Sequence, residues 1–276
     1  MVVGKAYDRL RLCLGICIFM FFLLFIAGFL LLNLTIVLAI VGLVGLIVSF
    51  ITYFAITRIG ESSALKQFSI ETAIPMVKDP QSPPSIPSVF YANRVPIPFT
   101  TITNLFTISP DFLIFTNTYW QAMPSLDRKQ IGSAEEHQSQ LCFFFTIREV
   151  KGYHTFILRY RLPLAAAEEM NFGQLGTRYG KSSPSIISGV EALDVNYVFF
   201  STVESEARAL ITRIKDCLLR MSAVFPKSCS YVIEEVALKA EVHLTGMYAL
   251  VRMDCAAAPH ISELYPIIRD MQQALN

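Results

Sequence analysis

The sequence predicts an α+β protein in which an N-terminal two-helix transmembrane hairpin precedes a mainly antiparallel β-sheet domain with packed helices. Three observations lead to this prediction. Residues 12–57 contain no charged side chain. From residue 99 onward, segments rich in Thr, Phe and Ile alternate with turn residues, which is typical of strands. From residue 204 an apolar stripe recurs every three or four residues, which is typical of a helix that packs on a sheet.

The uncharged run has the length of two membrane spans. A span needs about 20 apolar residues, and the run holds roughly 45 with a polar interruption at residues 33–35. It therefore divides into spans at 12–32 and 35–57, each too long for the apolar core of a secretory signal. Basic residues precede the first span and follow the second, which predicts a two-span integral membrane protein with both termini in the cytoplasm.

Small residues recur in the second half of this run. Gly42, Gly45 and Ser49 have the spacing that lets two helix backbones approach closely in lipid. They are the predicted helix-packing residues, and a homo-oligomer formed through the hairpin is one interpretation. The alternative is that small residues are simply common in apolar helices.

The rest of the chain divides into a linker and one folded domain. Residues 61–88 are predicted to be a juxtamembrane segment followed by a Pro- and Ser-rich linker, and residues 89–276 a cytosolic α+β domain, after the hairpin of residues 1–60. Of 23 Lys and Arg and 22 Asp and Glu, four basic and one acidic side chain lie in residues 1–60. A net charge of about −2 remains for the other residues, which excludes the basic surface of a nucleic-acid-binding protein.

Three hairpins and three helices are predicted in the domain. The hairpins join residues 99–108 to 112–117, 140–150 to 153–162, and 236–244 to 247–253, and the third is expected to have one solvated face. The helices cover residues 164–172, a stretch from Ser201 to Met221, and residues 260–275 with a break near Pro266. Ser201 and Glu204 have the spacing of a capping box.

One segment resembles a phosphate-binding loop. Gly176, Gly180, Lys181 and Ser182 are the candidate cofactor-binding residues, but three residues separate the glycines where the phosphate loop has four. The segment also follows a predicted helix instead of a strand. We therefore favour a solvated loop and predict no cofactor.

No catalytic or metal-binding residue is predicted. The histidines at positions 137, 154, 243 and 260 do not have metal-ligand spacing, and no nucleophile motif is present. Six cysteines occur without paired spacing, so neither a zinc site nor a disulfide framework is indicated. We expect His243, beside Glu241 on the solvated strand face, to be hydrated. Trp120 with Tyr119 is a candidate anchor for a partner, with core burial as the alternative.

Several short motifs carry a resemblance. They are Val190-Glu191, the aromatic strand at 197–201, Glu206-Ala207-Arg208 with Leu210, and residues 218–221. Together they resemble a family of bacterial membrane-anchored proteins of unknown function, in which two N-terminal spans precede a soluble domain. The chain departs from that pattern at Thr202-Val203. The resemblance implies an architecture and no activity. The predicted topology is also similar to that of chlamydial inclusion membrane proteins, which implies a scaffold presented to host cytosol.

Two function classes follow. The first is a membrane-anchored, non-enzymatic protein that displays its domain for protein-partner binding or scaffolding. The second is a tethered ligand sensor or enzyme, with residues 176–183 and the polar segment 123–139 as walls of its site. The expected location is the bacterial inner membrane, with a host-derived inclusion membrane as the alternative.

Overall fold

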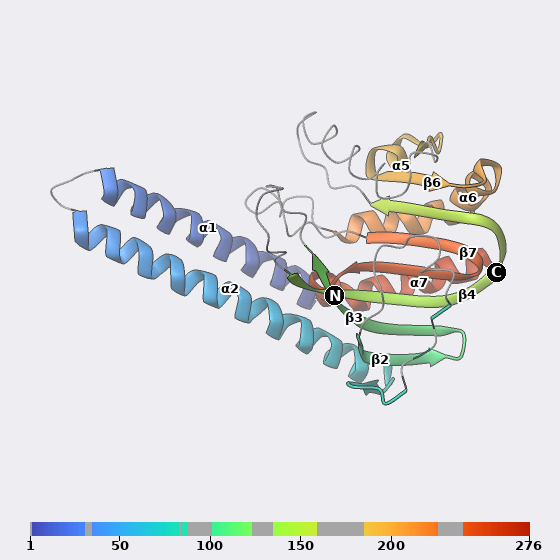
Figure 1. Cartoon of the computed structure of the whole chain (residues 1–276), viewed down its shortest axis with the longest axis horizontal. Helices are drawn as coiled ribbons and strands as arrows, with labels where there is room; N and C mark the ends of the chain where they lie inside the picture. Colours follow the sequence, from blue (N-terminus) through green and yellow to red (C-terminus); the bar gives the residue numbers. More distant parts are fainter. Residues whose placement is uncertain are drawn as a thin grey trace.

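The computed structural model describes residues 2–30, 35–82, 84, 86–87, 101–122, 135–158, 185–225 and 240–276. A long helical hairpin projects from one side of an α+β body (Figure 1). The body consists of an antiparallel sheet with helices packed on one face. The predicted α+β class with an antiparallel sheet is therefore confirmed.

Two long helices form the hairpin. Helix α1 spans Val2–Leu30 and helix α2 spans Thr35–Thr72. They pack against each other along the side of α2 that carries its small residues. A Cβ added at Gly42 would lie 2.8 Å from the backbone nitrogen of Phe25, and one at Gly45 would overlap the ring of Phe21. Ser49 on the same side is buried. The close approach of the two helices therefore depends on these small residues.

The prediction of two membrane spans is wrong. Among the helices in the described part of the chain, none combines the length and apolar composition that crossing a bilayer requires. The helices are not confined to the uncharged run: α1 begins before Lys5 and Arg9, and α2 continues through Arg58 and Lys66. The predicted two-span topology, its cytoplasmic termini, and both the bacterial inner membrane and inclusion membrane locations lose their basis.

The last turns of α2 belong to the core of the body. Leu65 and Phe68 are buried, and the ring of Phe68 makes edge contacts with Phe106 at 5.3 Å and Tyr265 at 5.4 Å between ring centroids. Ser69 donates a hydrogen bond to the carbonyl of Ile74 just after the helix. These contacts attach the hairpin firmly to the sheet and to the C-terminal helix.

The sheet contains seven strands in the residues that the structure describes, all paired antiparallel. From one edge, the strands follow the order β1-β2-β3-β4-β6-β5. Strand β7 also pairs with β4. The predicted first hairpin is confirmed, because β2 and β3 pair from Ser109 and Phe112 outward. The strands are β1 (Met76–Val77), β2 (Thr101–Ser109), β3 (Phe112–Ala122), β4 (Glu135–Leu158), β5 (Ser185–Ile186), β6 (Tyr197–Ser201) and β7 (Ala240–Asp254).

Strand β7 folds back on itself. Glu241 and Arg252 make an ion pair although 11 positions separate them. In a straight strand that separation would be about 36 Å. The chain must therefore reverse between them, at Thr245-Gly246, where Gly246 has a φ of 54°. The predicted third hairpin is confirmed in this respect.

Strand β4 also reverses, but its two arms do not pair with each other as predicted. Residues 140–146 pair with 248–254, whereas 153–157 pair with 241–245. The β7 hairpin is thus inserted between the two arms of β4, which curve around it at the right of Figure 1. The turn residues Lys151 and Gly152 lie at this bend, as expected. The predicted pairing of residues 140–150 with 153–162 is wrong, because each arm of β4 pairs instead with part of β7, which lies about 100 residues further along the chain.

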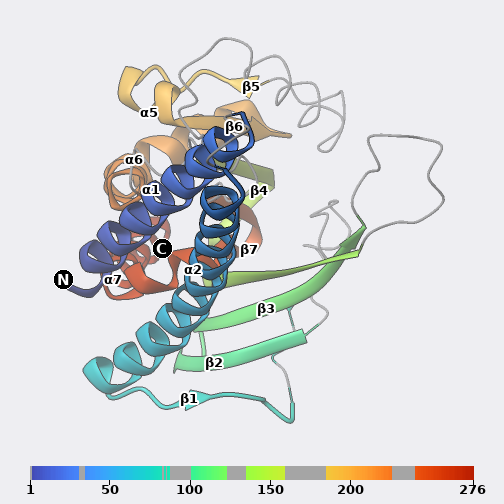
Figure 2. The same cartoon turned by 90° about the vertical axis from the view of Figure 1, so that its left-hand side faces the viewer.

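One face of the sheet carries the main hydrophobic core. Helices α6 (Glu204–Val224) and α7 (Ile261–Leu275) cover it together with the end of α2 (Figure 2). The short helix α5 (Glu191–Asn196) precedes β6, and the 3₁₀ helix η2 (Cys255–His260) precedes α7, which continues through Pro266 without the expected break. The core contains buried rings from four strands, namely Phe106 of β2, Phe112 of β3, Phe143, Phe145 and Phe156 of β4, and Phe199 of β6.

Candidate functional site

A buried polar cluster lies on the other face of the sheet, at its centre. Its members are Glu241, His243 and Arg252 of β7 and Tyr153 and Thr155 of β4. His243 is paired in register with Thr155, and all five side chains point away from the main core because the neighbouring residues of both strands face it. The predicted solvated face is therefore wrong, since Glu241, His243 and Arg252 are almost fully buried.

The cluster is a connected hydrogen-bond network. The guanidinium of Arg252 donates through Nε to Oε2 of Glu241 at 2.5 Å, and its second nitrogen pairs with the same oxygen. Nε2 of His243 lies 3.1 Å from that oxygen. On the other side of the ring, Nδ1 lies 2.8 Å from the hydroxyl of Tyr153 and 3.3 Å from Oγ1 of Thr155.

The network fixes the proton positions. Nε2 of His243 faces a carboxylate and must donate, so Nδ1 accepts the Tyr153 hydroxyl proton in the neutral ring. Burial lowers the pKa of His243, and the nearby Arg252 charge lowers it further against the opposing effect of Glu241. Burial acts to raise the pKa of Glu241, but Arg252 and the hydrogen bond from His243 outweigh it and hold that pKa below its usual range.

The pKa values of the titratable groups in this cluster are all shifted away from neutral pH. Burial raises the pKa of Tyr153 to about 12, so its hydroxyl stays protonated. Cys142, paired in register with Arg252, has a pKa raised to about 12 by burial. A general acid or base works best with a pKa near the working pH, and an attacking cysteine needs its thiolate form. The arrangement forms a hydrogen-bonded polar core within the sheet.

A second histidine ties the bend of β4 to the start of α6. The hydroxyl of Ser201 lies 2.7 Å from Nδ1 of His154, whose Nε2 lies 2.9 Å from the carbonyl oxygen of Lys151. Because a carbonyl can only accept, Nε2 carries the proton and Nδ1 accepts from the serine. Burial lowers the pKa of His154, so the ring is held neutral. The pair has the form of a nucleophile and its base.

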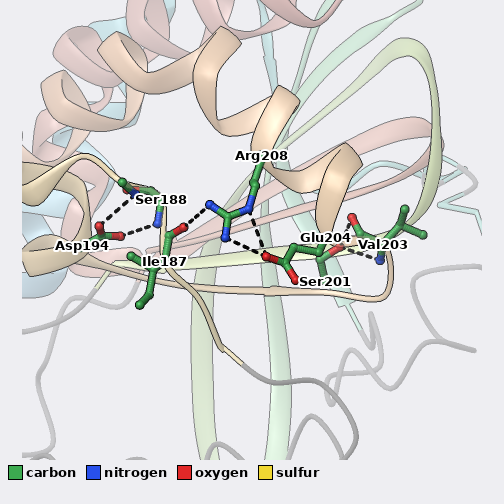
Figure 3. Close-up of polar contacts among 8 residues, drawn as sticks. Ile187, Ser188, Asp194, Ser201, Val203, Glu204 and Arg208 are labelled. Carbon is green, nitrogen blue, oxygen red and sulfur yellow. Dashed lines mark hydrogen bonds and ion pairs between the residues drawn. The ribbon is translucent and has the colours of Figure 1, made fainter.

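Ser201 is nevertheless engaged locally. Its hydroxyl oxygen accepts the backbone N–H of Val203 at 2.8 Å (Figure 3), in a tight turn before α6. The predicted capping box is wrong, because α6 begins at Glu204 with Val203 as the residue before it and without a side-chain cap. The backbone of Tyr153 exchanges hydrogen bonds with Thr202, so this turn is attached to the β4 bend.

The Glu-Ala-Arg motif of the sequence acquires a structural role. Arg208 donates from two of its nitrogens to Glu204 and from the third to the carbonyl oxygen of Ile187 at 2.8 Å (Figure 3). The carboxylate of Asp194 accepts the backbone N–H groups of Ser188 and Gly189. The motif therefore attaches α6 to the segment after β5.

The helical hairpin carries the other unusual surface of the protein. Between residues 10 and 59, among the described side chains, sixteen large apolar ones are well exposed, eight on each helix. They are Leu10, Ile16, Phe19, Met20, Phe22, Leu23, Leu24 and Ile26 on α1 and Ile40, Val41, Leu43, Val44, Ile47, Val48, Ile51 and Ile59 on α2. A contiguous exposed apolar surface of this extent is typical of an interaction site.

The structure places few of the predicted site residues in a common site. Gly42, Gly45 and Ser49 lie together where α2 meets α1. The candidates Gly176, Gly180, Lys181 and Ser182 lie outside the described residues, as does 123–134 of the polar segment, while 135–139 belong to β4. Tyr119 and Trp120 lie in β3.

The buried cluster was missed by sequence reasoning. Its signal was the alternation of β7, which puts Glu241, His243 and Arg252 on one face. That pattern was interpreted as a solvated face because alternation alone does not distinguish water from a second buried layer.

Comparisons with known proteins do not identify a family for this chain. No protein-family model matches the chain, and no curated protein matches it. Among solved structures, the crystal structure of the mycobacterial trehalose monomycolate transport factor A, TtfA, is similar with a TM-score of 0.41 and 10% sequence identity. The similarity covers 79% of this chain and 95% of that chain. A likeness this distant supports no conclusion about function.

Proposed function

We propose that this chain is a non-enzymatic scaffold protein that binds a protein partner through the exposed apolar surface of the α1–α2 hairpin. The observation that carries the proposal is the set of sixteen exposed large apolar side chains, fourteen of them on the segment without charge between residues 12 and 57. A helix that is apolar on all sides is normally buried. In this chain α1 and α2 cover each other on one side only, so another molecule is needed to cover the rest.

The extent of this surface is sufficient for a stable complex. Even at about 50 Å² for each of the sixteen side chains, covering them would bury about 800 Å², the area that a standard protein interface removes from each partner. The aromatic and methionine side chains among them, Phe19, Met20 and Phe22, belong to the types enriched in interface cores.

The α+β body is suited to be the displayed part. Its sheet is held by a closed polar network and by the contacts of Phe68, so the hairpin is attached to a rigid unit. The titratable groups of the network are each held in one protonation state near neutral pH, which favours a scaffold over an acid–base enzyme. The alternative of a ligand sensor with a site at residues 176–183 stays a prediction.

Photo-crosslinking in cells tests the proposal. The photoreactive residue p-benzoylphenylalanine is placed at Phe19 on the hairpin and, as the control, at exposed Lys215 on α6. We expect a discrete protein adduct, identified by mass spectrometry, at position 19 and not at position 215. Equal labelling at both positions, or adducts with lipid alone at position 19, would contradict the proposal.

A further inference from the structure

The outward side of α2 carries a regular apolar stripe. Ile40, Val44, Ile47 and Ile51 are separated by four, three and four positions, and each is about half exposed or more, up to 64% for Ile51. At 100° per residue these four side chains lie within about 60° of one another on the helix. Gly42, Gly45 and Ser49, which face α1, lie on the opposite side.

This spacing is that of a coiled-coil seam. Alternating steps of four and three residues place side chains at the two core positions of a heptad, where Ile and Val are preferred residues. Because both residue types are branched at Cβ, they lose little side-chain freedom when a second helix covers them. Helix α1 occupies the other side of α2, so the stripe is open to a further helix along this length (Figure 2).

We propose that the stripe Ile40–Val44–Ile47–Ile51 packs against the same stripe of a second copy of this chain. The inference rests on the proposed function and names the partner of the same surface. The complementary surface must be helical, free of charge and apolar, and the chain itself supplies such a surface. A symmetric contact between identical stripes closes as a dimer and leaves no stripe uncovered.

The area of such a contact is adequate. The stripe and its exposed neighbours Val41, Leu43 and Val48 supply seven apolar side chains per copy. At roughly 100 Å² each they bury about 700 Å² on each copy, close to the about 800 Å² of a standard interface. The contact is also uncharged, so its strength depends on burial of apolar area and not on ionic strength.

The test uses the purified full-length chain with p-benzoylphenylalanine at Ile47, and at Lys215 as the control for random collision. Irradiation should give a covalent dimer of twice 31.0 kDa at position 47 and not at position 215. A second variant adds Val44→Gln to the probe at 47, and its matched control adds Ile16→Gln, which alters an exposed apolar residue on the far side of the hairpin. We expect Val44→Gln to weaken association about tenfold or more and Ile16→Gln to leave it nearly unchanged.

Each outcome decides between the two proposals. A dimer yield at 47 no higher than at 215, or equal effects of Val44→Gln and Ile16→Gln, overturns the second-copy inference. If a probe at 47 in cells captures another identified protein instead, the inference fails and the proposed function stands. If hairpin positions in cells capture no protein at all, both fail. Circular dichroism of each variant shows whether the helices are retained.

Discussion

The α+β body and the helical hairpin distribute polarity in opposite ways. In the body, Glu241, His243 and Arg252 lie buried at the centre of a sheet. In the hairpin, large apolar side chains such as Ile51 and Ile16 face outward. The body can bury charge because every member of the network has a partner, whereas the hairpin lacks enough apolar surface of its own to cover both helices. The body thus buries its polar network within one chain, whereas the hairpin leaves the apolar surface that the proposed second copy would cover.

The largest expected effect comes from breaking the buried ion pair. Arg252→Met leaves the carboxylate of Glu241 buried without its cation, which should reduce the free energy of unfolding by about 3–5 kcal/mol. Urea unfolding of the full-length chain measures it. Arg220→Met is the matched control, because Arg220 and its partner Asp270 are each about half exposed and such a pair contributes about 0.5 kcal/mol.

The ion-pair experiment also separates charge from packing. The double variant Glu241→Gln with Arg252→Met removes both charges and should recover part of the loss. A loss below about 1 kcal/mol for Arg252→Met alone would show that the body does not depend on this network.

A smaller effect is expected at the bend of β4. Gly152 has a φ of 86°, and an added Cβ would lie 2.5 Å from Oγ1 of Thr202 and 2.8 Å from Cγ2 of Val203. Gly152→Ala should therefore cost about 2–3 kcal/mol, from backbone strain and loss of the Thr202 contact. Gly189→Ala is the control, since its φ is 79° but no atom lies within 4 Å, and it should cost about 1 kcal/mol. Equal losses of stability for Gly152→Ala and Gly189→Ala, in thermal or urea unfolding, would mean that the close contacts of Thr202 and Val203 with Gly152 add nothing to the cost.

The smallest effect is a pH dependence of stability. His243 and His154 have pKa values lowered by burial, so the unfolded chain binds protons that the folded chain does not. Their contribution is complete above the ordinary value of 6.5 and is lost as the pH falls below it, by up to about 1.4 kcal/mol per pH unit for each histidine. Glu241 does not contribute in this window, because its lowered pKa matters only below 4.5.

Urea unfolding between pH 7.5 and 5.5 measures this slope. His243→Gln should lower stability at every pH and also flatten the slope, because one proton-binding group has been removed. An unchanged slope would indicate that His243 is already charged in the folded chain, contrary to its contacts with Arg252 and Tyr153.

Local patterns predicted two turns and the packed face of one helix. Lys151-Gly152 and Thr245-Gly246 were placed correctly because glycine tolerates the backbone that such turns need. The stripe from Ala207 to Met221 predicted the packed face of α6, and those residues are buried. Each of these predictions depends on residues that are close in sequence.

Long-range features could not be predicted in the same way. The insertion of β7 between the arms of β4 depends on contacts such as that of Cys142 with Arg252, which no local pattern contains. The prediction of a solvated face was wrong because residues from other strand segments satisfy Glu241 and His243. Arg252 lies 11 positions further along β7, after the chain has reversed, and Tyr153 lies on β4. The membrane spans were inferred from the length of an uncharged run, but the helices extend beyond that run through the charged residues at both of its ends.

Light scattering of the full-length chain tests the central claim, that the hairpin is incomplete in one copy, most directly. In aqueous buffer at micromolar concentration we expect a particle mass of at least twice 31.0 kDa. Replacing Ile40, Val44, Ile47 and Ile51 together with Gln should return the mass to that of one chain while the body stays folded. A single-chain mass for the unaltered protein would contradict the account.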